Sequence, residues 1–115
     1  MKVTGVFKNA KTTRTVTPGT VVFEEGTSGS EMFGVIDGEI ELRTKGGRVF
    51  RVGPDDTFGE MALCDHSPRM ATAVAVEETT LAVIDDRTFL WLVHETPMFA
   101  LQVMSSLAGR LRALT

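Results

Sequence analysis

The chain has 115 residues, of which 43% are hydrophobic and 23% are charged, and its formal net charge is −3 at pH 7. This length corresponds to a single domain, residues 1–115, and the negative charge argues against a chain built to bind nucleic acid or an anionic membrane. The one cysteine, Cys64, excludes an internal disulfide and a cysteine-ligated zinc or iron–sulfur centre.

The N-terminal residues, Met1 to Ala10, contain no apolar run that could serve as a signal peptide. Elsewhere no stretch approaches the roughly 18 consecutive apolar residues that a membrane-spanning helix needs. We therefore expect a cytoplasmic protein that has no membrane partner.

Short β-strands separated by turn residues are predicted between about residues 12 and 85. A first apolar strand, 21–23, follows a Pro-Gly turn, and the run 32–36 ends at an Asp-Gly pair, which favours a hairpin. Residues 39–42 then alternate polar and apolar side chains, as expected for a half-buried strand. The remaining predicted strands are 49–52, 72–76 and 80–84. Turns that recur about every 8–12 residues indicate a sandwich, jelly roll or barrel.

The segment 58–72 carries the most chemical information. Gly59 has no Cβ and lets the backbone approach a ligand, and the helix-forming residues 60–63 would offer free N–H groups to an anion. Arg69 has a planar guanidinium that can bind two phosphate oxygens at once. The Glu60 carboxylate only accepts hydrogen bonds, which suits a sugar hydroxyl and not a phosphate. Together these groups indicate a ligand with a single phosphate beside a free hydroxyl, such as a ribose cyclic phosphate.

Two helices are predicted between about residues 86 and 114. The first covers 87–94, and the second has Thr96 as its N-cap and Pro97 as its first residue. Along the second helix apolar residues recur at heptad spacing, at Ala100, Met104, Leu107, Leu111 and Leu114. This stripe favours a helix that packs on its own domain, and the alternative is a helix that pairs with a second copy in a homodimer.

The two histidines, His66 and His94, fall in a predicted loop and a predicted helix. They do not provide the cluster of histidines and carboxylates that a metal-dependent enzyme on a β-barrel needs. We therefore predict a protein that is not an enzyme and holds no metal or cofactor.

The chain resembles the cyclic nucleotide-binding domain family. Residues 58–63 (Phe-Gly-Glu-Met-Ala-Leu) and 68–72 (Pro-Arg-Met-Ala-Thr) are similar to the phosphate-binding cassette of that family. Residues 18–26, 32–40 and 52–58 resemble the strands and turns that precede the cassette. The resemblance implies a mainly β fold with some α: an eight-stranded antiparallel β-roll of the double-stranded β-helix or jelly-roll type, with a short cassette helix and C-terminal helices.

The resemblance also implies a function, that of a non-catalytic sensor whose C-terminal helices move when a cyclic nucleotide binds. Arg69 would pair with the cyclic phosphate, and Glu60 would accept a hydrogen bond from the ribose 2′-hydroxyl. Met70 stands where members that prefer cGMP often carry threonine, so cAMP is the expected ligand and cGMP the less favoured one. The other expected contacts are the backbone amides around Gly59, Met61, Ala62 and Ala71, and the side chain of Val49 against the base.

Two alternatives stay open within this resemblance. The chain could be a degenerate cyclic nucleotide-binding fold that binds only protein, or the sensor fragment of a larger transcription regulator. A DNA-binding helix-turn-helix would have to follow residue 115, so no nucleic-acid binding is expected of this chain. In the family the last helix often contacts the base, and that contact would fall near Leu114 and Thr115.

Overall fold

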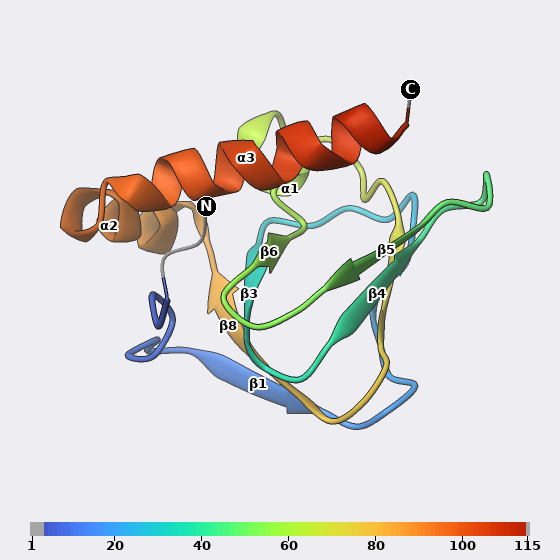
Figure 1. The fold of residues 1–115 in the computed structure, drawn as a ribbon, viewed down its shortest axis with the longest axis horizontal. Helices are drawn as coiled ribbons and strands as arrows, with labels where there is room; N and C mark the ends of the chain where they lie inside the picture. The colour runs from blue at the N-terminus through green and yellow to red at the C-terminus, as the bar shows by residue number, and fades with distance from the viewer. Residues whose placement is uncertain (1–3, 115) are drawn as a thin grey trace.

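The computed structural model describes residues 4–114, which form eight short strands and three helices (Figure 1). The predicted domain extends to residues 1–3 and 115, which lie outside the described residues. The elements in chain order are β1 (Thr13–Val16), β2 (Val21–Phe23), β3 (Met32–Asp37), β4 (Ile40–Arg43), β5 (Val49–Val52), β6 (Thr57–Phe58), α1 (Met61–Cys64), β7 (Thr72–Ala75), β8 (Thr79–Ile84), α2 (Asp86–Glu95) and α3 (Met98–Ala113).

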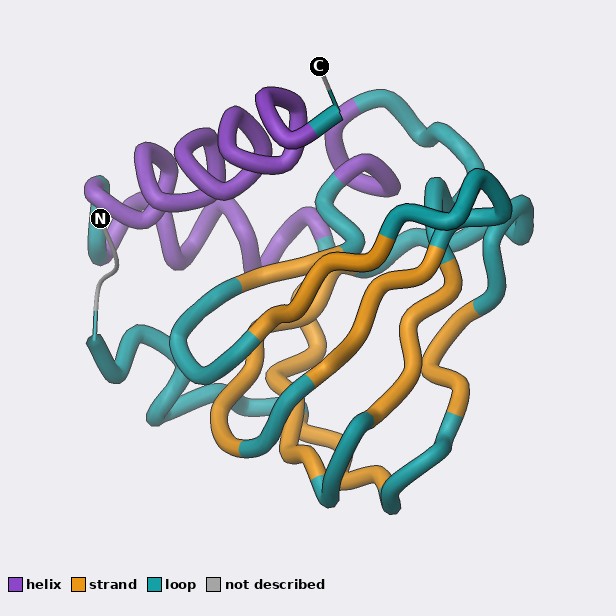
Figure 2. Tube along the Cα trace, turned by 45° about the vertical axis from the view of Figure 1, so that its right-hand side comes forward, coloured by secondary structure: helices purple, strands orange, loops and turns teal. Residues whose placement is uncertain are grey.

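The strands form two four-stranded antiparallel sheets, with the orders β1-β8-β3-β6 and β2-β7-β4-β5. The sheets face each other, and the helices gather at one end of the roll they make (Figure 2). The predicted antiparallel β-roll of the jelly-roll type is thus confirmed. The predicted strands 21–23 and 49–52 coincide with β2 and β5, three others differ by one residue at one end, and the predicted strand 39–42 is shifted by one residue relative to β4. Two strands were not predicted individually: β1 buries only Val16, and β6 has only two residues.

The Asp-Gly hairpin between β3 and β4 needs glycine at position 38. Gly38 has a φ of +96°, and a Cβ there would lie 2.6 Å from Cα of Thr79. Both the backbone conformation and the neighbouring strand therefore exclude a side chain at this position. The turn brings β4 back across the roll to the second sheet, which forms one wall of the cavity described below.

Three aromatic rings fill the space between the two sheets beneath the cassette. The ring of Phe58 lies 5.3 Å from that of Phe33 and 5.8 Å from that of Phe23, measured between centroids. Phe58 and Phe33 are fully buried, whereas Phe23 is half-buried and also borders the cavity. The core of the roll thus continues directly into the wall of the candidate site.

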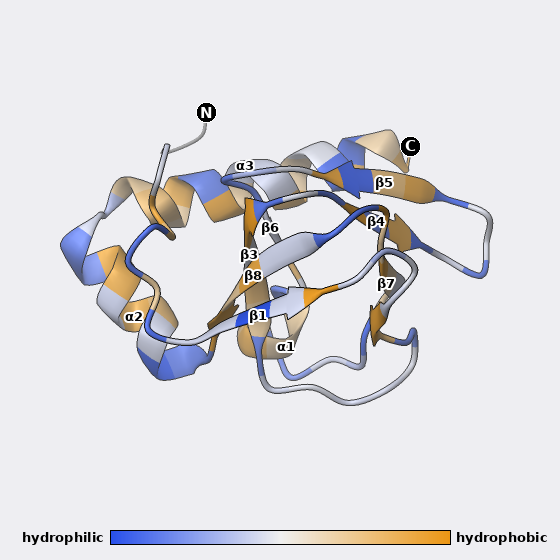
Figure 3. Ribbon diagram, turned by 90° about the horizontal axis from the view of Figure 1, so that it is seen from below, coloured by the Kyte–Doolittle hydropathy of each residue, from blue (hydrophilic) through white to orange (hydrophobic). Residues whose placement is uncertain are grey.

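A second core joins the helices to the roll. Phe7 packs edge-to-face on Phe99 of α3, with 5.7 Å between centroids, and both are buried with Leu92 of α2. Helix α2 begins at the cap residue Asp85, whose carboxylate accepts from the amide of Thr88. Both helices carry apolar and polar segments in alternation (Figure 3). No helix within residues 4–114 combines the length and the apolar composition needed to cross a bilayer.

The start of α3 and its buried face differ from the prediction. Thr96 ends α2 by donating its amide to the carbonyl of Leu92, so the N-cap position of α3 falls to Pro97. The buried residues of α3 are Phe99, Gln102 and Val103. Phe99 and Val103 each lie one position before a residue of the predicted stripe, and Gln102 lies two positions before Met104. Within that stripe Leu107 packs against the core, whereas Met104, Leu111 and Leu114 are exposed to 56%, 65% and 48%. The predicted stripe is therefore only partly buried against its own domain.

We predict that Phe58→Ala lowers the free energy of unfolding by about 3–5 kcal/mol, since it opens a cavity among the three rings. Leu90→Ala is the matched control, because Leu90 is 68% exposed, and its effect should stay within about 0.5 kcal/mol. Urea denaturation followed by circular dichroism measures both. A loss below about 1 kcal/mol for Phe58→Ala would show that these rings are not the core of the roll.

Candidate ligand-binding site

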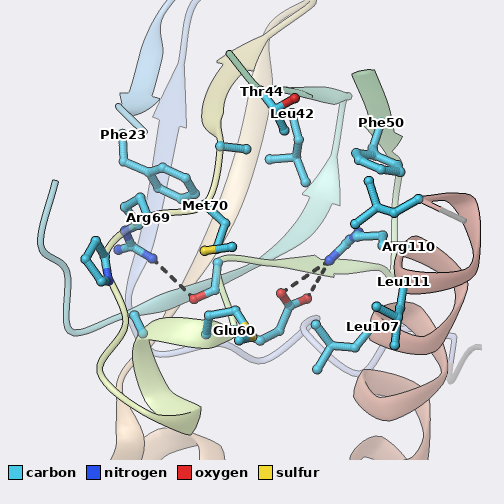
Figure 4. A pocket seen from close by; sticks show the side chains of 16 residues that line it. Phe23, Leu42, Thr44, Phe50, Glu60, Arg69, Met70, Leu107, Arg110 and Leu111 are labelled. Atoms are coloured by element: carbon cyan, nitrogen blue, oxygen red, sulfur yellow. Dashed lines mark hydrogen bonds and ion pairs between the residues drawn. The ribbon is translucent and has the colours of Figure 1, made fainter. Parts of the chain in front are cut away.

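A cavity of about 400 Å³ lies between the β2-β7-β4-β5 sheet, the cassette segment and the C-terminal half of α3 (Figure 4). The sheet contributes apolar side chains to one wall, and α3 contributes leucines to the opposite wall. The cassette segment closes the end between them. A pocket of this kind, apolar with a few convergent polar groups, is typical of a small-molecule site.

The cassette segment reaches the cavity through a glycine in a left-handed conformation. Strand β6 ends at Phe58, and Gly59 follows with a φ of +79°, which turns the chain into Glu60 and the short helix α1. A Cβ on Gly59 would lie 2.9 Å from Nη1 of Arg69. The glycine thus allows both the turn and the close approach of the arginine.

Arg69 is a buried cation that has no ion-pair partner among residues 4–114. Its side chain is 7% exposed and lies over the ring of Phe23, 4.1 Å from the centroid. Its Nη1 donates to the carbonyl of Gly59 at 3.2 Å, but Nε has no hydrogen-bond partner in the described structure. Burial lowers the pKa of Arg69 from its ordinary value, and the negative charge of Glu31 partly offsets this effect. A buried charge without a partner is costly, so this position favours an anionic ligand.

Glu60 is equally buried, at 3% exposed, but it has a partner on the far side of the cavity. Nη1 of Arg110 in α3 donates to both of its carboxylate oxygens, at 3.0 and 3.2 Å, and the hydroxyl of Thr57 donates at 3.0 Å. Nη2 of Arg110 also donates to the carbonyl of Thr57. The ion pair crosses the cavity between the cassette and the helix (Figure 4).

A polar stripe on α3 holds Arg110 in this position. Gln102, Ser106 and Arg110 follow one another every four residues and therefore share one face of the helix. Gln102 donates to the carbonyl of Asp55, and Ser106 donates to the carboxylate of Asp56 at 2.6 Å. The spacing of these three residues could have been noticed in the sequence. The sequence analysis missed Arg110, because its partner lies fifty residues away in the chain.

The structure brings most of the predicted site residues to one cavity. Its lining includes the cassette residues Gly59, Glu60, Met61, Ala62, Arg69, Met70 and Ala71. The prediction for Val49 needs correction, because its side chain is 55% exposed and does not line the cavity. Neighbouring side chains of a strand point to opposite faces, so it is Phe50 that borders the cavity, together with Leu42.

The opposite wall contains the last leucines of the helix. Leu107, Leu111 and Leu114 of the predicted stripe all border the cavity. Within the described part of the chain, no group of three or more histidine, cysteine, aspartate and glutamate side chains could hold a metal ion. The ligand-directed groups of the cavity are therefore one buried cation, one buried ion pair and an apolar lining.

Comparisons with known proteins agree with this geometry. The cyclic AMP receptor protein of Thermus thermophilus is 37% identical over 99 residues, which cover 82% of this chain and 46% of that protein. The crystal structure of the Thermus thermophilus catabolite activator protein superimposes with a TM-score of 0.73 and 34% identity, covering 90% of this chain and 51% of that one. The chain thus spans about half the length of these relatives.

A second structure, solved in work on a cyclic-GMP-dependent signalling pathway in bacterial phytopathogenesis, superimposes with a TM-score of 0.76 and 29% identity. It matches 94% of this chain and 90% of that one. The family described as the cyclic nucleotide-binding domain matches residues 13–96, from β1 to the end of α2. The chain therefore belongs to the cyclic nucleotide-binding domain family.

Proposed function

We propose that this chain is a non-catalytic sensor, a single domain over residues 1–115 that binds cAMP in preference to cGMP. The observation that carries the proposal is the cation of Arg69, which is buried beside the cavity and has no ion-pair partner among residues 4–114. A cyclic phosphate would supply the missing negative charge and accept bidentate hydrogen bonds from the guanidinium. The backbone around Gly59, Met61, Ala62 and Ala71 borders the same part of the cavity and would surround the phosphate.

Glu60 is assigned to the ribose. Its carboxylate can only accept hydrogen bonds, and the 2′-hydroxyl is the donor that a ribose cyclic phosphate offers. Arg110 already donates to the same carboxylate, so the hydroxyl would join an existing polar group that spans the cavity.

The base is assigned to the apolar part of the cavity, between the sheet and α3. Phe50 and Leu42 would contact one face of the base, in place of Val49, and Leu111 would contact the other. Met70 borders this part and is 65% exposed, and its thioether cannot donate a hydrogen bond to a guanine. The relative named cyclic AMP receptor protein supports the choice of cAMP, while the relative from a cyclic-GMP-dependent pathway makes cGMP the competitor to test.

The signal is assigned to α3. This helix lines the cavity and is joined to the cassette by the Arg110–Glu60 pair, so a ligand in the cavity would contact both. A ligand that binds one position of the helix better than another shifts the population between the two. In a larger transcription regulator, a DNA-binding or other output domain would receive this shift. The cyclic AMP receptor protein of Thermus thermophilus has about twice the length of this chain. We assign no nucleic-acid contact to the chain itself, given its net charge of −3.

We further propose that the sensor works in the cytoplasm, where a lone cysteine remains reduced.

We also propose that α3 pairs with α3 of a second copy of the chain. The exposed face of α3 carries Leu101 and Met104, which are 51% and 56% exposed. Large apolar side chains on an exposed helical face favour association. Such a homodimer would place two sensor cavities beside a shared pair of helices.

Removal of the Arg69 guanidinium should weaken cAMP binding by about 2 kcal/mol, close to 30-fold, because the phosphate loses a charged hydrogen-bond partner. Isothermal titration of wild type and Arg69→Ala with cAMP, cGMP and 5′-AMP measures this, and wild type should prefer cAMP. Arg87→Ala, which removes an exposed arginine outside this cavity, is the control and should bind as wild type does. If the folded wild type binds no cyclic nucleotide even at millimolar concentration, the chain is a degenerate fold that binds protein.

Wild type should bind cAMP about tenfold more tightly than 2′-deoxy-cAMP, which corresponds to one hydrogen bond to a charged acceptor. Glu60→Gln should show a clearly smaller preference, because a neutral amide oxygen replaces the charged acceptor. The control is Glu41→Gln, which alters an ion-paired glutamate on β4 outside the cavity and should keep the tenfold preference. An equal preference in wild type and Glu60→Gln would remove Glu60 from the ribose site.

Size-exclusion chromatography with light scattering should give wild type about twice the mass of one 12.5 kDa chain. Met104→Glu should give a single chain, because a carboxylate at the centre of the apolar face would be buried without a partner. Leu90→Glu, on the exposed side of α2, is the control and should remain a dimer. A monomeric wild type at millimolar concentration would contradict the pairing of α3.

A further inference from the structure

The connection between β2 and β3, residues 24–31, runs along the guanidinium of Arg69 and leaves no room for a side chain there. A Cβ built on Gly29 would lie 2.5 Å from Nε of Arg69 and still closer to its Cζ and Nη2. Real Cβ atoms essentially never approach other atoms this closely, so one of the two groups would have to move. The φ of Gly29 lies outside the left-handed region, so its backbone conformation does not by itself require glycine. The requirement for glycine at position 29 is therefore steric, because a side chain there would overlap the guanidinium of Arg69.

The connection itself is held in place on both sides of Arg69. The amide of Gly26 donates to the carbonyl of Arg69 at 2.7 Å, and the amide of Arg69 donates to the carbonyl of Thr27 at 2.8 Å. Next to them, the amide of Glu25 donates to the hydroxyl of Thr72 at 3.0 Å. These three hydrogen bonds join the connection to the cassette segment, at Arg69 and Thr72. The guanidinium, at the end of a flexible side chain, is the softer partner and would be the group displaced.

Three groups thus define where the guanidinium lies. The ring of Phe23 covers one face, the carbonyl of Gly59 accepts from Nη1, and the backbone of Gly29 borders the Nε side. Gly59 also approaches the guanidinium, but its φ of +79° means that any side chain there would strain the turn as well. A substitution at Gly29 therefore tests the steric requirement alone, without straining a left-handed backbone.

We infer that Gly29 is a positioning residue for the phosphate site: its missing side chain leaves the space that holds the Arg69 guanidinium in its binding position. This inference rests on the proposed function, in which Arg69 binds the cyclic phosphate. Gly29 itself contacts no ligand and acts only through Arg69. A methyl group at this position would leave the hydrogen-bonded backbone intact but push the guanidinium away from the Gly59 carbonyl and out of line with the phosphate.

The test compares Gly29→Ala with Gly53→Ala, a matched control. Gly53 also lacks a left-handed φ, and a Cβ there would meet nothing within 4 Å. Isothermal titration should show cAMP affinity at least tenfold weaker for Gly29→Ala and unchanged for Gly53→Ala, with both proteins folded. Wild-type affinity in Gly29→Ala would overturn the inference.

A second background separates positioning from a general structural effect. Lysine lacks the broad guanidinium, so Gly29→Ala in an Arg69→Lys protein should meet no clash and cause no further loss of affinity. The same double variant should restore folding if Gly29→Ala alone proves unstable. A further tenfold loss in the Arg69→Lys background, or a failure to restore folding, would overturn the inference, because Gly29 would then act through other contacts.

A measurement without ligand separates this inference from the proposed function. The Nε–Hε resonance of Arg69, assigned by its loss in Arg69→Lys, should be shifted by the ring of Phe23 in wild type. Gly29→Ala should move it toward the position of an exposed arginine, and Gly53→Ala should not. If wild type binds no cyclic nucleotide, the proposed function fails, while this resonance still decides whether Gly29 positions the guanidinium. An unmoved resonance in Gly29→Ala would contradict the inference even if cAMP binds.

Discussion

The guanidinium of Arg69 is buried, and no carboxylate among residues 4–114 forms an ion pair with it. Such a charge is unfavourable in isolation, and its position is tolerated because an aromatic ring and one carbonyl partly compensate for the lost water. The missing negative charge is the feature on which the proposed binding of an anionic ligand depends. Three nearby features border the guanidinium: the left-handed turn at Gly59, the connection through Gly29, and the ring of Phe23, which extends the core up to the site.

The buried carboxylate of Glu60, unlike the guanidinium of Arg69, has an ion-pair partner. Glu60 obtains its counter-charge from Arg110, fifty residues further along the chain, so the cassette and α3 are joined by a buried ion pair. Within residues 4–114 the cavity therefore holds one cation without an ion-pair partner and one carboxylate that has such a partner. In the proposed function, an anionic ligand would add most at Arg69, and a sugar hydroxyl would add to the existing pair. Because Arg110 belongs to α3, a ligand that contacts Glu60 would also be linked to that helix.

Local patterns in the sequence determined the fold class and the cassette. Alternating side chains and regularly spaced turns predicted the strands of the β-roll to within a residue, because strand periodicity and turn chemistry are encoded by neighbours in the chain. The acceptor Glu60 and the cation Arg69 were also found this way, since the turn, the short helix and the loop that hold them lie within fifteen consecutive residues. Short strands such as β6 carried too few residues to be recognised.

Tertiary structure alone decided which side chains meet across the cavity. The pairing of Arg110 with Glu60, the steric fit of Gly29 beside Arg69, and the replacement of Val49 by Phe50 in the lining all depend on how distant segments pack. In the sequence Arg110 resembled any cation near a helix C-terminus, and Gly29 resembled any loop glycine. Sequence pattern determined the type of each element, but not always the face that it buries, as α3 shows. The partner that each face meets is determined by packing, because contacts between residues far apart in the chain leave no periodic trace.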